Sequence, residues 1–218
     1  MSSEVIVSVD CSNRWTCVGL AVDGAPLGEK NLFLERAQAG RLPIVTAGLL
    51  SEFSLKVHDI TCLAVAVGPG YFTGIRIGMA YAAGLAFALG VGIVPLSSLQ
   101  ITLRSCPQWN RGLKIPLVAA SRELAFSSFW LDGRQILPEA ERSREEIERA
   151  AAEISSEYQM CAVDDVRLFA SSSRDGVSFV KCPSGAASAL MAWDLREHRV
   201  KPDALRAEYM REPGLGNT

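Results

Sequence analysis

The sequence predicts an α/β fold made of two mixed sheets, each flanked by helices. Three observations lead to this prediction. The first half of the chain has the hydrophobic pattern of three strands, a helix, a strand, a second helix and a further strand. A strand-and-turn pattern from the start of the chain recurs near residue 115. A glycine-rich turn joins a buried strand to an apolar helix at residues 65–79.

The opening segment predicts three antiparallel strands, at residues 4–10, 15–22 and 28–33. The first is an apolar run that ends at Asp10, and a polar turn at residues 12–14 leads into the second. Asp23 and Gly24 form a dipeptide that tight hairpins favour. The sheet is therefore expected to begin with a meander.

A helix, a strand, a second helix and a last strand follow, at residues 42–57, 60–67, 73–89 and 93–96. The first helix is predicted from apolar residues at helical spacing, which are Ile44, Leu49, Leu50, Phe53 and Val57. The complete order β-β-β-α-β-α-β is typical of an RNase H-like unit, in which helices pack on a mixed sheet.

The second half repeats the opening pattern. Residues 115–123 have the pattern of a strand and a polar turn, and residues 124–131 that of a second strand. Asp132 and Gly133 then form another hairpin signal. Two unrelated hairpins would give the same pattern, but we favour a duplicated unit, which is the architecture of actin-like proteins.

The boundary between the two units is predicted where Pro107, Asn110 and Gly112 interrupt the pattern. This places an N-terminal lobe at residues 1–106 and a smaller C-terminal lobe at residues 107–218. The remaining expected elements are a helix opened by the capping box of Ser143 and Glu146, strands at residues 159–163 and 177–180, and a helix at residues 186–197.

Composition describes a globular protein, since 49% of the 218 residues are hydrophobic and 21% are charged. The net charge of −2 gives no support for strong, autonomous binding to nucleic acid or to an anionic membrane. A local basic patch is still compatible with the sequence, because Arg104, Arg111 and Lys114 lie close together along the chain.

Cysteine and histidine spacing gives no support for a metal site. None of the six cysteines forms a CxxC pair, and His58 and His198 lie far apart in sequence. Unpaired cysteines in apolar runs are typical of a reducing compartment. Because the first ten residues also lack the basic start of a signal peptide, the chain is expected in the cytoplasm.

One uncharged stretch, at residues 77–103, is long enough to span a membrane. It contains Gly84, Gly90, Gly92 and Pro95. Gly90 and Gly92 favour a break between a buried helix and a buried strand, so no membrane association is predicted.

The glycine-rich turn is the strongest candidate for a binding loop. Gly68 and Gly70 can adopt positive φ, and Thr73 is predicted as the N-cap of the helix that follows. Such a turn can hold an anion on backbone N–H groups, or it can let another backbone approach closely. Asp10 can serve a metal-bound water beside a nucleotide, or it can cap its own tight turn. The candidate anion or nucleotide loop comprises Asp10, Gly68, Gly70, Thr73 and Gly74.

The helix after the turn carries small residues at a spacing of four, which are Gly74, Gly78 and Ala82. This spacing allows close approach of a second helix, either from this chain or from a partner protein. Arg76 is the only charged residue between Thr73 and Gly90. Because a cation near a helix N-terminus opposes the helix dipole, we expect Arg76 to pair with Asp10.

These segments carry a resemblance to a known family. The block at residues 68–78, followed by Ala80 and Gly84, resembles the signature of the bacterial TsaB (YeaZ) family. Residues 6–12 and 208–211 occur in the family's order. The residues that depart from the family pattern, and so weaken any expectation of phosphate chemistry, are Ala66, Tyr71 and Ala120.

The resemblance implies an actin/Hsp70-like (ASKHA) fold and a non-catalytic accessory role in forming threonylcarbamoyladenosine in tRNA. It implies a TsaD-like catalytic partner, a TsaE-like ATPase and a homodimer as a further association, with tRNA contacted only through the complex. No cofactor is expected in the isolated chain, and ATP with magnesium only at a shared interface. The interface implied on the two helices consists of Leu49, Phe53, Gly74, Arg76, Gly78 and Ala82.

Two enzymatic alternatives stay open. The first is an ATP-dependent phosphotransferase or ATPase of the same fold, which would use Asp10 and the loop at residues 68–74. The second is a peptidase, for which the sequence offers neither a G-x-S-x-G elbow nor a recognisable pair of nucleophile and base. The resemblance implies the non-catalytic role instead, so we predict that the chain is not an enzyme.

Overall fold

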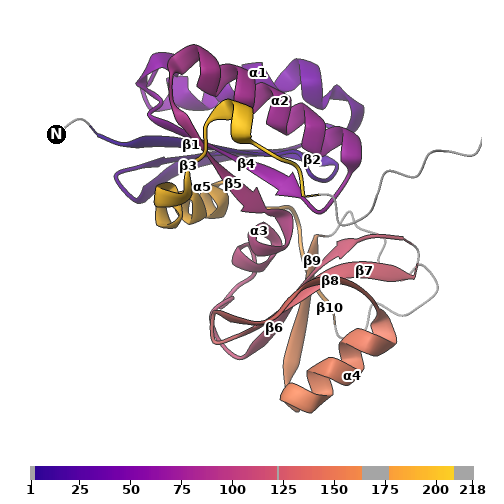
Figure 1. Cartoon of the computed structure of the whole chain (residues 1–218). Coiled ribbons are helices and arrows are strands. Elements are labelled where there is room, and N and C mark those ends of the chain that lie inside the picture. Colours follow the sequence, from indigo (N-terminus) through magenta and orange to yellow (C-terminus); the bar gives the residue numbers. More distant parts are fainter. Residues whose placement is uncertain (1–2, 122, 164–176, 209–218) are drawn as a thin grey trace, which may run out of the picture.

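The computed structural model describes residues 3–121, 123–163 and 177–208. Figure 1 shows two lobes, each built around a mixed sheet. The first sheet contains β1 (Val5–Asp10), β2 (Trp15–Val22), β3 (Ala25–Phe33), β4 (Cys62–Gly68) and β5 (Gly92–Ser97). The second contains β6 (Leu113–Ala119), β7 (Leu124–Leu131), β8 (Arg134–Ser143), β9 (Tyr158–Val163) and β10 (Val177–Val180).

Five α-helices are found in the described residues: α1 (Gln38–Glu52), α2 (Phe72–Leu89), α3 (Ser98–Arg104), α4 (Arg144–Ile154) and α5 (Gly185–Asp194). Short 3-10 turns complete the elements: η1 (Glu35–Ala37), η2 (Val57–Asp59), η3 (Arg196–His198) and η4 (Pro202–Ala204). The predicted strands and helices are found close to their expected bounds, except that α1 ends at Glu52 and Val57 lies in η2. α3 and β8 were not predicted.

The two sheets have the same topology. The strand order is β3-β2-β1-β4-β5 in the first sheet, and β8-β7-β6-β9-β10 describes the second in the same direction. In each, the first three strands are antiparallel and the last two run parallel to the first. The duplicated actin-like fold predicted from the sequence is therefore confirmed.

Both hairpin turns use the residues that the sequence singled out. Asp23 and Gly24 have φ of 50° and 80°, and Asp132 and Gly133 have φ of 50° and 77°. Positive φ at both central residues is the geometry whose twist matches paired antiparallel strands, and Asp-Gly adopts it at little cost. The two halves therefore share turn chemistry as well as strand order.

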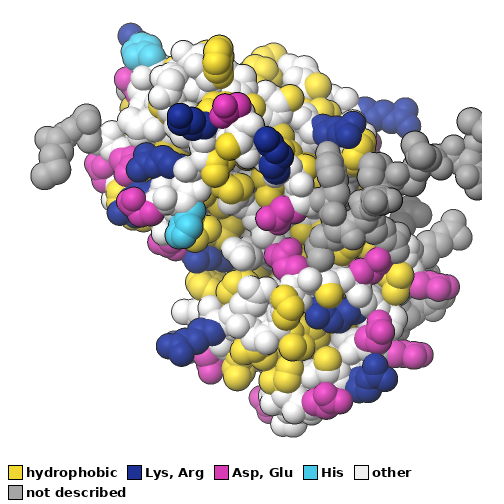
Figure 2. All heavy atoms as spheres, in the orientation of Figure 1, with side chains coloured by type: hydrophobic (Ala, Val, Ile, Leu, Met, Phe, Trp, Pro, Cys, Tyr) yellow, Lys and Arg dark blue, Asp and Glu magenta, His cyan; other side chains and the backbone are white. Residues whose placement is uncertain are grey.

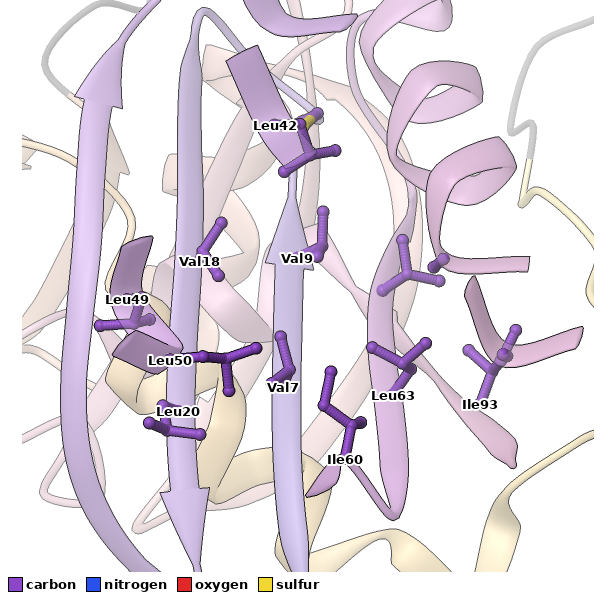
Figure 3. Close-up of a cluster of buried hydrophobic side chains, with 14 of the residues drawn as sticks. Val7, Val9, Val18, Leu20, Leu42, Leu49, Leu50, Ile60, Leu63 and Ile93 are labelled. Atoms are coloured by element: carbon purple, nitrogen blue, oxygen red, sulfur yellow. The ribbon is translucent and has the colours of Figure 1, made fainter. Parts of the chain in front are cut away.

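The central strand of the first lobe is covered on both faces. Val7 and Val9 belong to one buried cluster with side chains of α1, and Figure 3 shows Leu42 and Leu50 of that helix over this strand. Ile6 points to the opposite face and packs with Met191 of α5. Since successive strand residues alternate between faces, burial on both sides requires an unbroken apolar run, and this is what the segment contains.

The last described segment returns to the first lobe. α5 packs against β1, β2 and β3, and Val200 pairs with Ile93 at the edge of β5. An ideal Cβ at Gly19 would lie 1.8 Å from the Gly185 carbonyl oxygen, so this docking depends on two facing glycines. The strands do divide between the sheets at the predicted boundary, but α5 belongs to the layers of the first lobe. The division into domains at residues 106 and 107 stays a prediction.

The lobes meet through α3 and through side chains at the ends of strands. α3 contacts β4 and β5 in the first lobe and β6 and β9 in the second. The Ser97 hydroxyl donates a hydrogen bond of 2.5 Å to the Glu139 carboxylate. Trp15, at the start of β2, packs against the hydrophobic core of the second lobe. These contacts tie the two sheets across the linker.

The uncharged stretch is divided as expected. α2 ends at Leu89, Gly90 takes the left-handed conformation with φ 69°, and β5 then joins the sheet. Among the described residues, α2 is the one helix long and apolar enough to cross a membrane, and its inner face packs on β4. Arg122 of the predicted polar turn and residues 209–211 of the family-like segment near the end of the chain lie outside the described residues.

Candidate functional site

The glycine-rich loop packs directly on the turn between β1 and β2. The Tyr71 backbone N–H donates a hydrogen bond of 2.7 Å to the Ser12 carbonyl oxygen. An ideal Cβ would lie 2.3 Å from that same oxygen at Gly70, and 1.9 Å from the Cys11 carbonyl oxygen at Gly74. Both positions therefore require glycine, because a neighbouring backbone occupies the space of a side chain.

At Gly68, the space of a side chain is occupied in the same way by the backbone of Glu208. The φ of Gly68 is 130°, which residues with a Cβ rarely adopt, and an ideal Cβ would lie 2.6 Å from the Glu208 carbonyl oxygen. The Glu208 N–H donates a 2.9 Å hydrogen bond to the Val67 carbonyl oxygen, which extends the end of β4. The structure thus shows close approach of backbones at this loop, and the anion role stays a prediction.

Asp10 caps its own turn. Its carboxylate accepts a hydrogen bond of 2.8 Å from the Ser12 backbone N–H and is almost completely buried. Burial raises the pKa of Asp10 above its ordinary value, although the hydrogen bonds from Ser12 oppose this effect. The arrangement matches the local capping role rather than a carboxylate exposed to a nucleotide.

Two expectations about the start of α2 are wrong. The helix begins at Phe72 with Tyr71 as its N-cap, so Thr73 lies inside the first turn, because Gly70 and Tyr71 are held against Ser12. Arg76 is exposed, and its guanidinium lies 3.6 Å from the centroid of the Phe72 ring. Since Asp10 is buried below the loop, it does not serve as the expected counter-ion of Arg76.

The small-residue face predicted for a partner is internal. Gly74, Gly78, Ala82 and Leu49 are all buried. The nearest atoms to an ideal Cβ at Gly78 belong to Val65, Cys11 and Val9, so this face packs on the sheet. Of the six residues predicted at the interface, only Arg76 and Phe53 are exposed. Small residues at a spacing of four mark this face because a helix that lies close to a sheet needs them as much as one that meets a partner helix.

The opposite sides of α1 and α2 are exposed, and the exposed charged residues of these two helices are Arg41, Glu52 and Arg76. Gly40, Gly48 and Gly84 lie in these helices with no atom within 4 Å of an ideal Cβ. Ile44 is 62% exposed and Phe87 is 80% exposed. We call this surface the outer helix face and define it by Gly40, Ile44, Ala47, Gly48, Arg76, Ala80, Gly84 and Phe87. Its sequence signal is the pair Gly40 and Gly48, eight residues apart in α1, which was not among the residues predicted for an interface.

Two cavities flank α2. One of about 910 Å³ lies at its start, beside the turn between β1 and β2 and the beginning of α1. The other, of about 610 Å³, lies at its end and is lined by Phe87, Val91 and Pro202 among others. Both belong to the first lobe.

The remaining candidates are dispersed. Arg104 pairs with Asp194 at 2.8 Å and lies over the Trp109 ring, while Lys114 contacts Gln159 in the second lobe. Figure 2 shows basic and acidic side chains interspersed on the coloured part of the viewed face. Within residues 3–121, 123–163 and 177–208, no three histidine, cysteine or acidic side chains are grouped to hold a metal ion.

Comparison with known proteins adds to this geometry. The family described as TsaD, tRNA N6-adenosine threonylcarbamoyltransferase, matches residues 33–126, which is less than half of the chain. A curated relative from Bacillus subtilis, tRNA threonylcarbamoyladenosine biosynthesis protein TsaB, is 29% identical over 125 residues. That match covers 57% of this chain and 54% of the relative. The resemblance to the TsaB (YeaZ) family is confirmed.

Further TsaB and YeaZ proteins are similar to this chain in sequence or in structure. The TsaB protein of Haemophilus influenzae is 29% identical over 99 residues, covering 45% of this chain and 42% of the relative. The chain thus spans about half the length of these curated TsaB relatives. YeaZ from Pseudomonas aeruginosa superposes with a TM-score of 0.72 at 20% identity, over 94% of this chain and 99% of YeaZ.

A second crystal structure, described as an uncharacterized protein with similarity to peptidase YeaZ from Pseudomonas aeruginosa, gives a TM-score of 0.75 at 22% identity. The superposition covers 95% of this chain and all of that one. At such low identity the two YeaZ-like structures show the fold alone, and they agree with the two-lobed duplication described above.

Proposed function

We propose that the chain is a non-catalytic scaffold subunit in the biosynthesis of tRNA threonylcarbamoyladenosine. The curated relatives carry this biosynthesis in their names. On this proposal the chain pairs with a TsaD-like catalytic subunit, and a TsaE-like ATPase joins the complex in the cytoplasm. ATP and magnesium bind only at an interface shared with a partner.

The outer helix face carries this proposal. An exposed glycine inside a helix costs roughly 0.5–1 kcal/mol relative to alanine, and the face holds three of them without any contact inside the chain. Large apolar side chains lie beside them, since Ile44 and Phe87 are largely exposed. Notches next to apolar side chains suit the close approach of partner helices.

Substitutions on this face provide the test. Ala80→Leu and Gly84→Leu fill the notches from the exposed side, where Gly84 has no neighbour within 4 Å. We expect each variant to fold normally and to lose at least tenfold in affinity for a TsaD-like protein, because added side chains hold the helices apart. Titration of the purified pair by light scattering or interferometry measures this loss.

Ala152→Leu in α4 is the matched control, because it adds the same bulk to an exposed helix position of the second lobe. Its partner affinity is expected to stay at the level of the unmodified chain. Unchanged affinity in all three variants would contradict the proposed surface. Tight binding of ATP and magnesium to the isolated chain, abolished by Asp10→Ala, would favour the ATPase alternative instead.

A further inference from the structure

The cavity at the start of α2 is lined by charge of mainly one sign. Arg14 comes from the turn after β1, and Arg36 comes from η1. Glu35 is the acidic residue that lines this cavity, and its carboxylate lies 3.7 Å from the Arg14 guanidinium. Two arginines against one glutamate form a locally basic site on a chain with a net charge of −2.

The start of α2 adds to this positive potential. Its N-cap, Tyr71, makes no side-chain hydrogen bond to the helix, and the first turn contains no acidic residue. Thr73 and Gly74 of this turn line the cavity, and Arg76 follows within the next turn. The positive end of the helix dipole and nearby guanidinium groups on three separate elements favour a bound anion.

An aromatic side chain borders the same cavity. Tyr71 is 44% exposed, and the Phe72 ring beside it is covered by the Arg76 guanidinium. A partly exposed ring beside arginines is the combination with which proteins hold single-stranded RNA, by stacking a base and neutralising phosphate. A cavity of about 910 Å³ has room for a nucleotide.

We propose that this cavity binds one nucleotide of a single-stranded RNA segment, with its phosphate between Arg14, Arg36 and the start of α2 and its base against Tyr71. The contact is direct, in contrast to the expectation that the chain meets tRNA only through its complex. The choice of RNA rests on the proposed function, whereas the anion site itself does not.

Fluorescence anisotropy with a labelled single-stranded RNA of roughly ten nucleotides tests the site on the full chain at low salt. Arg14→Ala combined with Arg36→Ala is expected to weaken binding at least tenfold and to lower the salt slope by about two. Tyr71→Ala is expected to weaken it roughly tenfold, through loss of stacking. Arg134→Ala combined with Arg149→Ala removes the same charge from the second lobe and is expected to change affinity by less than twofold.

A substitution that removes negative charge from the cavity is expected to have the opposite effect on RNA affinity. Glu35→Gln removes the acid from the lining and is expected to strengthen RNA binding severalfold. Glu157→Gln, an exposed change in the second lobe, is expected to have little effect. Arg14→Lys combined with Arg36→Lys keeps the charge and is expected to retain more affinity than the alanine pair, which separates charge from folding.

Several results would overturn the RNA site. They are absence of binding by the unmodified chain, equal losses in the two arginine-to-alanine pairs, or saturation by free AMP without any binding of RNA. Capture of a TsaD-like protein by the Arg14→Ala, Arg36→Ala chain is measured in parallel. If this variant loses RNA binding but still captures the TsaD-like protein, the RNA site and the scaffold function are separate. Failure of one can then be told apart from failure of the other.

Discussion

At the scale of single residues, glycines have opposite meanings in this chain. Gly74 is confined by the Cys11 carbonyl oxygen, which leaves no room for a Cβ, whereas Gly84 faces open space. Both lie in α2, but only Gly74 belongs to the series of small residues at a spacing of four. Which of them serves the interior and which serves the surface depends on the rotation of α2 about its axis.

Substitution by alanine separates the two kinds of glycine. Gly74→Ala is expected to lower the free energy of unfolding by about 2–3 kcal/mol, because the backbone of Cys11 must move. Gly84→Ala is the matched control and is expected to raise it by roughly 0.5–1 kcal/mol through better helix propensity. Urea denaturation of both variants measures the difference, and equal stabilities would contradict the packing described for α2.

Asp10 is expected to make stability depend on pH. Its pKa is raised in the folded chain, so the folded state holds the proton to a higher pH than the unfolded state. Its contribution to stability is therefore full below the ordinary value of 3.8 and is lost as pH rises through the folded pKa.

Asp10→Asn keeps an oxygen that can accept from Ser12 and removes this titration. The variant is expected to be more stable than the unmodified chain at neutral pH and equally stable at low pH. Thermal unfolding from about pH 3 to about pH 8, which brackets the ordinary pKa of 3.8, measures the trend. A variant that is less stable at neutral pH would show that the ionised carboxylate is used.

At the scale of elements, α5 shows how a distant segment is fixed to the first sheet. The Glu29 carboxylate of β3 accepts hydrogen bonds of 2.8 Å from the Ser184 hydroxyl and from the Ala186 backbone N–H. Partial burial would raise the pKa of Glu29, but the hydrogen bonds from Ala186 and Ser184 lower it overall. A carboxylate at the start of α5 also suits the helix dipole.

Glu29→Gln is expected to destabilise the docked helix by about 1 kcal/mol, the usual effect of losing a charged cap. Because the pKa is lowered on folding, this contribution is present above the ordinary value of 4.5 and is lost as pH falls through the folded pKa. Hydrogen exchange of the α5 amides measures the effect directly. Glu157→Gln is the control, and equal exchange rates in the two variants would contradict the cap.

At the scale of the whole molecule, two lobes with sheets of identical topology differ in the segments that pack on them and in the surfaces that they carry. The first lobe receives α5 and the pairing of Val200 with Ile93, and its central strand is covered on both faces. It also carries the outer helix face and both cavities beside α2. The surfaces that support the proposed functions are therefore all on the first lobe, with the second lobe tied to it through α3 and Ser97.

The sequence by itself determined most of the elements, the duplication and the family resemblance, because these follow from local signals. Apolar runs bounded by turn residues predicted the strands, and the Asp-Gly pairs predicted both hairpins. The capping box of Ser143 and Glu146 is present in the structure as expected. Each of these signals acts between residues close together in the chain.

Only the tertiary structure decided what lies against what. It buried Gly74, Gly78 and Ala82, placed Glu208 against Gly68, and brought α5 back to the first sheet. A helix that is apolar nearly all round has no side marked in its sequence as the inner one. Its orientation was set by the shape of the sheet, where the backbone of Cys11 leaves space only for glycine.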